Sequence, residues 1–116
     1  MSRFEEFLRI NKDLVKFAQF EDLVDNYNKL TQLDFPIDMS RLFKELFIHA
    51  CFYDRLPVAQ WLYQEVYLTF SVLAQIGLRP VFNYCHHFAS RRKYLELAKW
   101  LEQIQMETKI RLGLVK

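Results

Sequence analysis

Two nine-residue segments of the chain are similar. The first, LPVAQWLYQ, begins at Leu56, and the second, LELAKWLEQ, begins at Leu95, which gives an offset of 39 residues. Five of the nine positions carry the same residue, and the only two tryptophans of the chain, Trp61 and Trp100, share one of these positions. Recurrence at one offset and in one helical phase is typical of stacked helix pairs. One pair cannot bury its own apolar face, so the pattern predicts stacked antiparallel helical hairpins.

The similarity continues upstream of these segments at the same offset. Ala50 pairs with Ala89, and Cys51 pairs with Ser90, so all four positions hold small residues. Small residues let neighbouring helices approach closely, while the wide tryptophan side chains fill the space against the next pair. The residues with a predicted structural role on this pattern are Ala50, Cys51, Trp61, Ala89 and Trp100.

The composition favours helices in a single domain. The 116 residues are 52% hydrophobic and include only 2 Gly and 3 Pro, which is too apolar for a disordered chain and poor in helix breakers. The length fits one all-α domain. No apolar run approaches the roughly 20 residues of a membrane-spanning helix, and the N-terminal segment lacks the apolar core of a signal peptide. We therefore predict no membrane contact.

The connection between the two similar segments is long and apolar. Its residues VYLTFSVLAQI are expected either to be buried beneath the repeats or to form an interface. Within it, LTFSVLAQIG is either a short buried helix closed by Gly77 or a packed loop, and Pro80 is expected to open the next helix. The predicted parts of the single helical domain 1–116 are a degenerate or capping helix pair (1–35), a first clear repeat with the inserted connection (38–76), a second repeat (79–109) and a tail (110–116).

The repeated segments resemble the ankyrin repeat, in particular the divergent form found in large DNA viruses of amoebae. His87 stands where that pattern has the histidine that braces the hairpin, which adds it to the predicted structural residues. Asp54 and Lys93 stand where the pattern has the turn glycine, and the offset exceeds the usual length of about 33 residues. The first copy matches the pattern at Phe47, Ala50, Cys51, Leu56, Val58, Ala59, Trp61 and Leu62, and the second at Ala89, Leu95, Leu97, Ala98, Lys99, Trp100 and Leu101.

This resemblance implies a degenerate ankyrin-like solenoid fragment and a function without chemistry. Such a scaffold binds a protein partner through its hairpin turns and inserted connections. The resemblance to viral repeats implies that this partner is a host or virion protein and that the compartment is the host cytoplasm. The residues near the two turns that we assign to partner binding are Tyr53, Asp54, Arg55, Arg91, Arg92, Lys93 and Tyr94.

Two other functions are consistent with the sequence. A structural virion or assembly component would form a homo-oligomer through exposed apolar surface. A nucleic-acid-binding protein would use the basic turn at Arg91, Arg92 and Lys93. The net charge of only +2, from 16 basic and 14 acidic residues, speaks against nucleic acid, because such proteins usually carry a clear basic excess.

The cysteine and histidine residues could in principle hold zinc or a nucleophile. No CxxC or HxxxH spacing occurs, and adjacent residues of a helix point about 100° apart, so the CHHF segment cannot easily share one metal ion. A Cys–His nucleophile needs an oxyanion hole, and the chain has no Gly-rich loop to build one. We predict core cysteines in a reducing intracellular compartment, hydrogen-bonded histidines, no metal, no cofactor and no enzymatic activity. The residues in question are His49, Cys51, Cys85, His86 and His87.

Overall fold

The computed structural model describes residues 2–114, and this part of the chain is all-helical, without a β-strand. The all-α prediction is therefore confirmed. The predicted tail begins inside the last helix, at Ile110, and its final two residues lie outside the described range. The helices are α1 (Arg3–Lys16), α2 (Phe20–Asn28), α3 (Met39–Phe52), α4 (Leu56–Glu65), α5 (Val72–Arg92) and α6 (Leu95–Arg111), with short 3₁₀ turns η1 (Leu30–Gln32) and η2 (Tyr67–Thr69).

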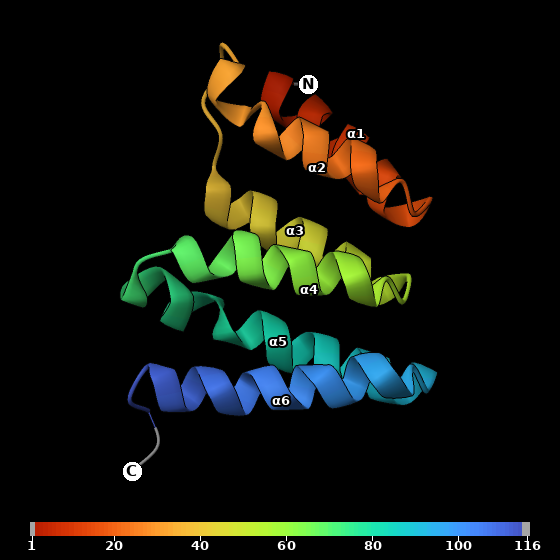
Figure 1. Ribbon diagram of the computed structural model, residues 1–116, viewed down its shortest axis with the longest axis vertical. Coiled ribbons are helices and arrows are strands. Elements are labelled where there is room, and N and C mark those ends of the chain that lie inside the picture. The colour runs from red at the N-terminus through yellow and green to blue at the C-terminus, as the bar shows by residue number, and fades with distance from the viewer. Residues whose placement is uncertain (1, 115–116) are drawn as a thin grey trace.

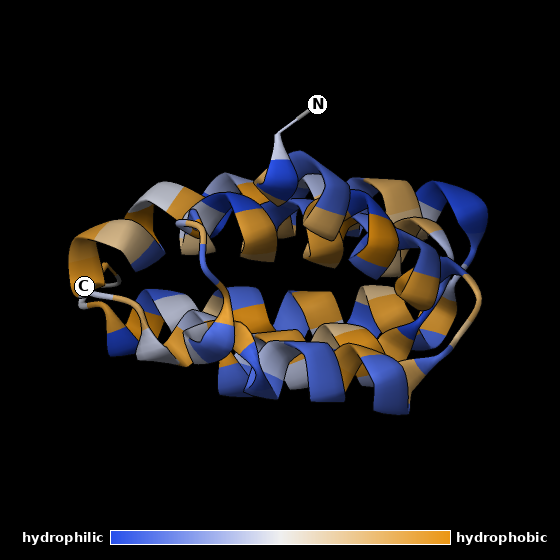
Figure 2. Cartoon of the chain, turned by 90° about the horizontal axis from the view of Figure 1, so that it is seen from above, coloured by the Kyte–Doolittle hydropathy of each residue, from blue (hydrophilic) through white to orange (hydrophobic). Residues whose placement is uncertain are grey.

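The helices form consecutive antiparallel pairs, which stack along the long axis of the molecule (Figure 1). Helix α1 pairs with α2, α3 with α4, and α5 with α6, and close backbone contacts also link α1 to α3 and α3 to α5. The first helices of the pairs thus form one layer and the second helices another. Seen from above, hydrophobic residues of both layers face the space between them (Figure 2). The core of the protein lies between these two layers.

The turn inside each of the three described pairs has the same backbone geometry. Ala18, Asp54 and Lys93 adopt left-handed φ angles of 57°, 54° and 60°. The next residue in each turn donates its N–H to a carbonyl five positions earlier, which is the hydrogen bond of a Schellman helix end. The first pair, in which the sequence shows no repeat motif, therefore closes like the other two. These hydrogen bonds run from Gln19 to Leu14 (2.8 Å), from Arg55 to Ala50 (2.7 Å) and from Tyr94 to Ala89 (2.9 Å).

Helix α5 runs without a break through Gly77 and Pro80. The predictions that Gly77 ends a short helix, or lies in a packed loop, and that Pro80 opens a new one are therefore wrong. The Ser71 side chain caps the true start of α5 by accepting the N–H of Ala74 at 3.2 Å. The helix continues because Phe82 and its buried neighbours on both sides of Pro80 pack into the core, and this packing outweighs the hydrogen bond that the proline cannot donate.

The inserted connection is partly buried and partly exposed, so the expected burial beneath the repeats holds for only a part of it. Val66 and Tyr67 are almost fully buried, and the Tyr67 ring lies 4.9 Å from Phe82. Burial raises the pKa of Tyr67 to about 12, and its hydroxyl donates to the Gln75 carbonyl at 2.7 Å. In contrast, Leu73 is 82% exposed at the start of α5. The connection thus fills the core with one end and leaves apolar surface at the other.

Candidate interaction surface at the hairpin turns

All three described hairpin turns lie along one side of the stack, at the right of Figure 1. The predicted partner-binding residues are therefore brought together, although they come from turns about 40 positions apart in a chain with a repeat offset of 39. Asp54 of the α3–α4 turn and Lys93 of the α5–α6 turn line the same shallow groove, together with Tyr94 and Glu96. This side of the protein is the candidate interaction surface.

Four aromatic rings connect the two turns, and we call them the aromatic ladder: Tyr53, Phe52, Phe88 and Tyr94. Phe52 at the end of α3 stacks on Phe88 of α5 with ring centroids 4.6 Å apart and planes inclined by 19°. Tyr53 lies 5.6 Å from Phe52, and Tyr94 lies 6.4 Å from Phe88. Phe52 remains 43% exposed, so the ladder presents aromatic surface to solvent.

Cationic groups lie on the faces of these rings. The Arg92 guanidinium is 5.2 Å from the Phe88 centroid and 6.0 Å from that of Phe52. At the other end of the ladder, the Lys16 ammonium lies 5.6 Å from the centroid of Tyr53. Cation–π contacts of this kind contribute about 0.5–1 kcal/mol at exposed positions. They hold the long side chains in place without neutralising their charge.

The sequence placed Tyr53 and Tyr94 among the predicted partner-binding residues, but not Phe52 and Phe88, although Phe88 lies near the basic turn. Both phenylalanines lie within the last turns of their helices, next to predicted turn residues. They are 36 positions apart, which does not match the offset of 39, so the repeat register did not pair them. An aromatic residue within the last turn of a helix, ahead of a basic or polar turn, was the signal that could have found them.

Arg55 differs from the other predicted partner-binding residues because its side chain forms a hydrogen bond to another helix pair. Its Nη2 donates to the Lys16 carbonyl at 2.7 Å, at the end of α1, where a cation also interacts favourably with the helix dipole. Its Nε is buried and has no hydrogen-bond partner in the described part of the chain. Arg55 therefore braces the first pair against the second.

The two tryptophans each join one pair to the preceding one. Trp61 of α4 packs edge-on against Tyr27 of α2 at 5.2 Å, and Trp100 of α6 packs in the same way against Tyr63 of α4 at 5.9 Å. Both indole side chains are half-buried. The predicted small residues Ala50, Cys51 and Ala89 are almost fully buried at the helix ends. These residues thus occupy positions that hold the stack together.

His87 is placed differently from the predicted hairpin brace. It is exposed, and its side chain makes no hydrogen bond within the described residues. It lines a shallow hollow on α5 with Tyr84 and Arg91. The structure therefore gives no bracing contact to His87, because the turn is closed by backbone hydrogen bonds instead.

The cysteine and histidine side chains form no metal-binding cluster among residues 2–114. Cys51 and Cys85 are buried free thiols, and burial, together with the neighbouring Cys85 sulfur, raises the pKa of Cys51. Burial also lowers the pKa of His49, whose ring packs 5.0 Å from Tyr53. The Cys51 thiol is thus kept protonated and shielded, which is the opposite of what a nucleophile or a metal ligand needs.

The described helices include none that is long and apolar enough to span a membrane. In the comparisons with known proteins, no protein family, no curated protein and no solved structure matches this chain.

Proposed function

We propose that the chain is a non-enzymatic scaffold that binds a protein partner through its hairpin turns. One observation carries this proposal: where two turns meet, the exposed Phe52 ring stacks on Phe88, and Arg92, which forms no ion pair in the described range, lies on both rings. Rigid surfaces that combine aromatic and arginine side chains are enriched at protein interfaces. A surface that is already ordered also loses little conformational entropy when a partner binds.

We also propose that the stacked pairs are a degenerate ankyrin-like solenoid. Two features support this. The left-handed residues Asp54 and Lys93 occupy the positions of the turn glycine in the ankyrin pattern. The Tyr–Trp contact also recurs at both junctions between pairs. In such solenoids the turns and their connections form extended binding surfaces.

The test compares the proteins captured by three versions of the chain. The turn variant carries Arg91→Glu, Arg92→Glu and Lys93→Glu. The control variant carries Lys29→Glu, Lys44→Glu and Lys109→Glu, which makes the same change of charge at three exposed lysines outside the turns. We expect partners that the wild type and the control retain and the turn variant loses. Capture of the same proteins by all three versions would show that the turns are not the binding surface.

Self-association is a second candidate function, and the exposed part of the inserted connection favours it. Leu68, Val72 and Leu73 are 41%, 58% and 82% exposed, and their segment lies on the side of the stack opposite the hairpin turns (Figure 1). A pair of such patches could join two copies of the chain. Sedimentation equilibrium tests this directly: a dimer that Leu73→Glu dissociates supports it, and a monomer at all concentrations contradicts it.

A further inference from the structure

We infer that the α5–α6 turn and the aromatic ladder bind an acidic segment of the partner, one that also carries an apolar side chain. This inference rests on the proposed function and adds the chemistry of the partner to it. It follows from the pairing of charges in the protein, the position of Arg92, and a hollow next to the turn.

The cations of the α5–α6 turn have no acidic partner within the protein. In the described range, every ion pair lies between residues 3 and 45, and Arg91, Arg92 and Lys93 form none. All three side chains are exposed. A carboxylate forms short, charge-assisted hydrogen bonds with such groups, and arginine can bind it with two parallel N–H donors. The turn therefore offers a site for carboxylates.

The cations are also partly fixed before any partner binds. The contacts of Arg92 with Phe88 and Phe52 restrict its long side chain. The turn fixes only the backbone of Lys93, which is left-handed and whose N–H donates to the Ser90 carbonyl at 3.2 Å. A partner that binds here loses less conformational entropy than it would on freely rotating side chains.

An apolar surface adjoins these cations. Tyr84, which is 55% exposed, lines a hollow on α5 with Pro80, Phe88 and Arg91. An apolar side chain of the partner would be covered there while neighbouring carboxylates pair with Arg91 and Arg92. The hollow and the adjoining cations are therefore the reason why we assign both acidic and apolar side chains to the partner segment.

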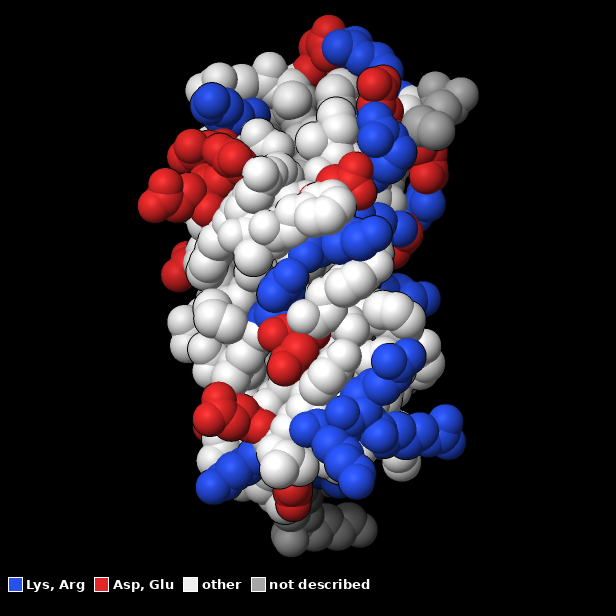
Figure 3. Space-filling model, turned by 90° about the vertical axis from the view of Figure 1, so that its right-hand side faces the viewer, with Lys and Arg blue, Asp and Glu red and all other residues white. Residues whose placement is uncertain are grey.

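A protein segment fits this surface better than a nucleic acid. Figure 3 shows a cluster of Lys and Arg at the level of the α5–α6 pair, whereas near the first pair Lys and Arg lie beside many Asp and Glu. Asp54 and Glu96 also line the groove next to Lys93. A phosphate backbone extends far beyond one turn and would meet these carboxylates, while a short acidic segment can stay within the basic area.

The experiment selects peptides from a displayed random library on the intact protein and then measures their binding by fluorescence polarisation. We expect selected peptides to be rich in Asp and Glu and to contain an aromatic or aliphatic residue. The turn variant should weaken their binding by at least about tenfold, and added salt should weaken it further, because charge pairs at the edge of an interface are screened. The control variant should bind like the wild type.

A further variant separates the contribution of the apolar hollow from that of the basic turn. Tyr84→Ser removes apolar area at an exposed position, so it should weaken the peptide without changing the salt dependence. Neutral or basic selected peptides, or acidic ones that bind the turn variant as well as the wild type, would overturn the inference. Tighter retention of single-stranded DNA than of the selected peptide, with a steep salt dependence lost in the turn variant, would overturn it in favour of nucleic acid.

Failure of this inference can be told apart from failure of the proposed function. If the turn variant loses protein partners but the selected peptides are not acidic, the turns bind a partner of other chemistry. If the turn variant keeps all partners, the proposed function fails, whatever the peptides show. A selected acidic peptide that displaces a captured partner would support both.

Discussion

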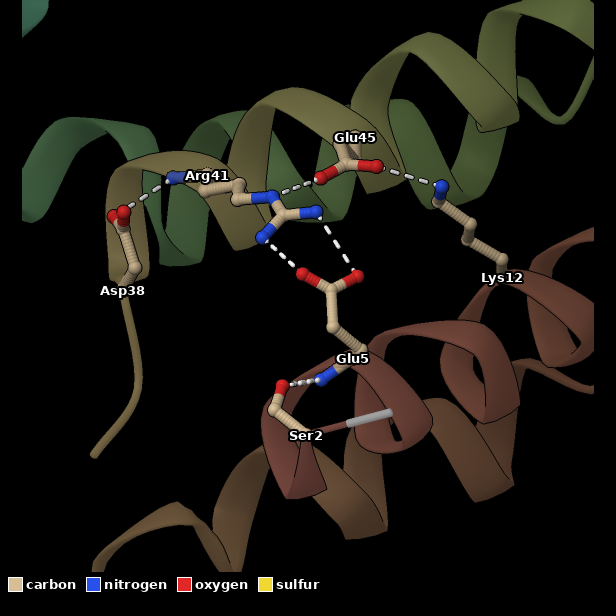
Figure 4. A network of polar contacts seen from close by, with 6 residues as sticks. All are labelled: Ser2, Glu5, Lys12, Asp38, Arg41 and Glu45. Atoms are coloured by element: carbon tan, nitrogen blue, oxygen red, sulfur yellow. Dashed lines mark hydrogen bonds and ion pairs between the residues drawn. The ribbon is translucent and has the colours of Figure 1, made fainter. Parts of the chain in front are cut away.

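The charges between α1 and α3 and the charges at the α5–α6 turn differ in how they are satisfied. Between α1 and α3, Arg41 binds both Glu5 and Glu45, and Lys12 binds Glu45 with its ammonium 2.6 Å from the carboxylate (Figure 4). One Nη of Arg41 lies 3.0 Å from Glu5 Oε2, and its Nε lies 2.6 Å from Glu45 Oε2. These charges join the first two pairs.

At the α5–α6 turn, Arg92 contacts aromatic rings. Neither it nor Arg91 or Lys93 forms an ion pair within the described part of the chain. The first region thus uses its charges to join two helices, and the second leaves them available to another molecule. The comparison teaches that the number of charged residues says little about binding. What matters is whether the fold brings an opposite charge to each of them.

The largest expected difference concerns Arg41. Arg41→Ala leaves Glu5 and Glu45 near each other without their shared cation, so we expect a measurable fall in the free energy of unfolding. Arg91→Ala removes a cation without an acidic partner and should change it by less than about 0.5 kcal/mol. Urea unfolding of both variants measures this, and equal losses would mean that Arg91 has a stabilising role that the structure does not give it.

Acid should weaken the first region before it affects the turn. Burial raises the pKa of Glu45, but hydrogen bonds and charge interactions with Lys12 and Arg41 outweigh it, so the pKa lies below its ordinary value of 4.5. The stability from these contacts is therefore present above that value and is lost as the pH falls through the lowered pKa. The free energy of unfolding, measured across acidic pH, should decline less for Glu45→Gln than for the wild type. A decline of the same size in both would exclude Glu45 as its source.

A glycine at position 93 should raise the stability of the protein and weaken its binding of an acidic peptide. Lys93→Gly relieves a left-handed backbone that costs non-glycine residues energy, so we expect a gain of about 0.5–1 kcal/mol in the free energy of unfolding. The same change removes a cation and should weaken an acidic peptide. Asp54→Gly is the matched control, because Asp54 has the same backbone geometry as Lys93 and the opposite charge. It should gain less stability, since aspartate tolerates this conformation better, and should not weaken the peptide.

The smallest effect is expected from Arg92→Lys. This change keeps the charge but loses the planar group on the rings, so the stability should stay within about 0.5 kcal/mol of the wild type. Peptide affinity should fall by less than in the charge-reversal variant. Thermal unfolding and fluorescence polarisation together measure this. An affinity equal to that of the wild type would show that only the charge of Arg92 contributes.

Much of the fold follows from local patterns. The shared register of Ala50 with Ala89 and of Trp61 with Trp100 predicted two hairpins with buried small residues and recurring tryptophan positions, and the structure places all four accordingly. The turn of the first pair could not be found in this way, because Ala18 carries no residue signal for its left-handed backbone. Gly77 and Pro80 predicted a helix boundary, because local rules cannot include the burial that carries α5 across them.

The sequence by itself determined the helical class, the hairpin register and the residue types at the turns, because these depend on neighbours within about one repeat along the chain. Only the tertiary structure decided which of these residues are free to bind. Arg55 is taken up by the end of α1, and Arg41 by carboxylates from two helices. Phe52 stacks on Phe88 of another pair and stays partly exposed. Arg92 lies on that ring pair with its charge unpaired. Such contacts join side chains that are distant in the sequence, and only the packing of the pairs brings them together.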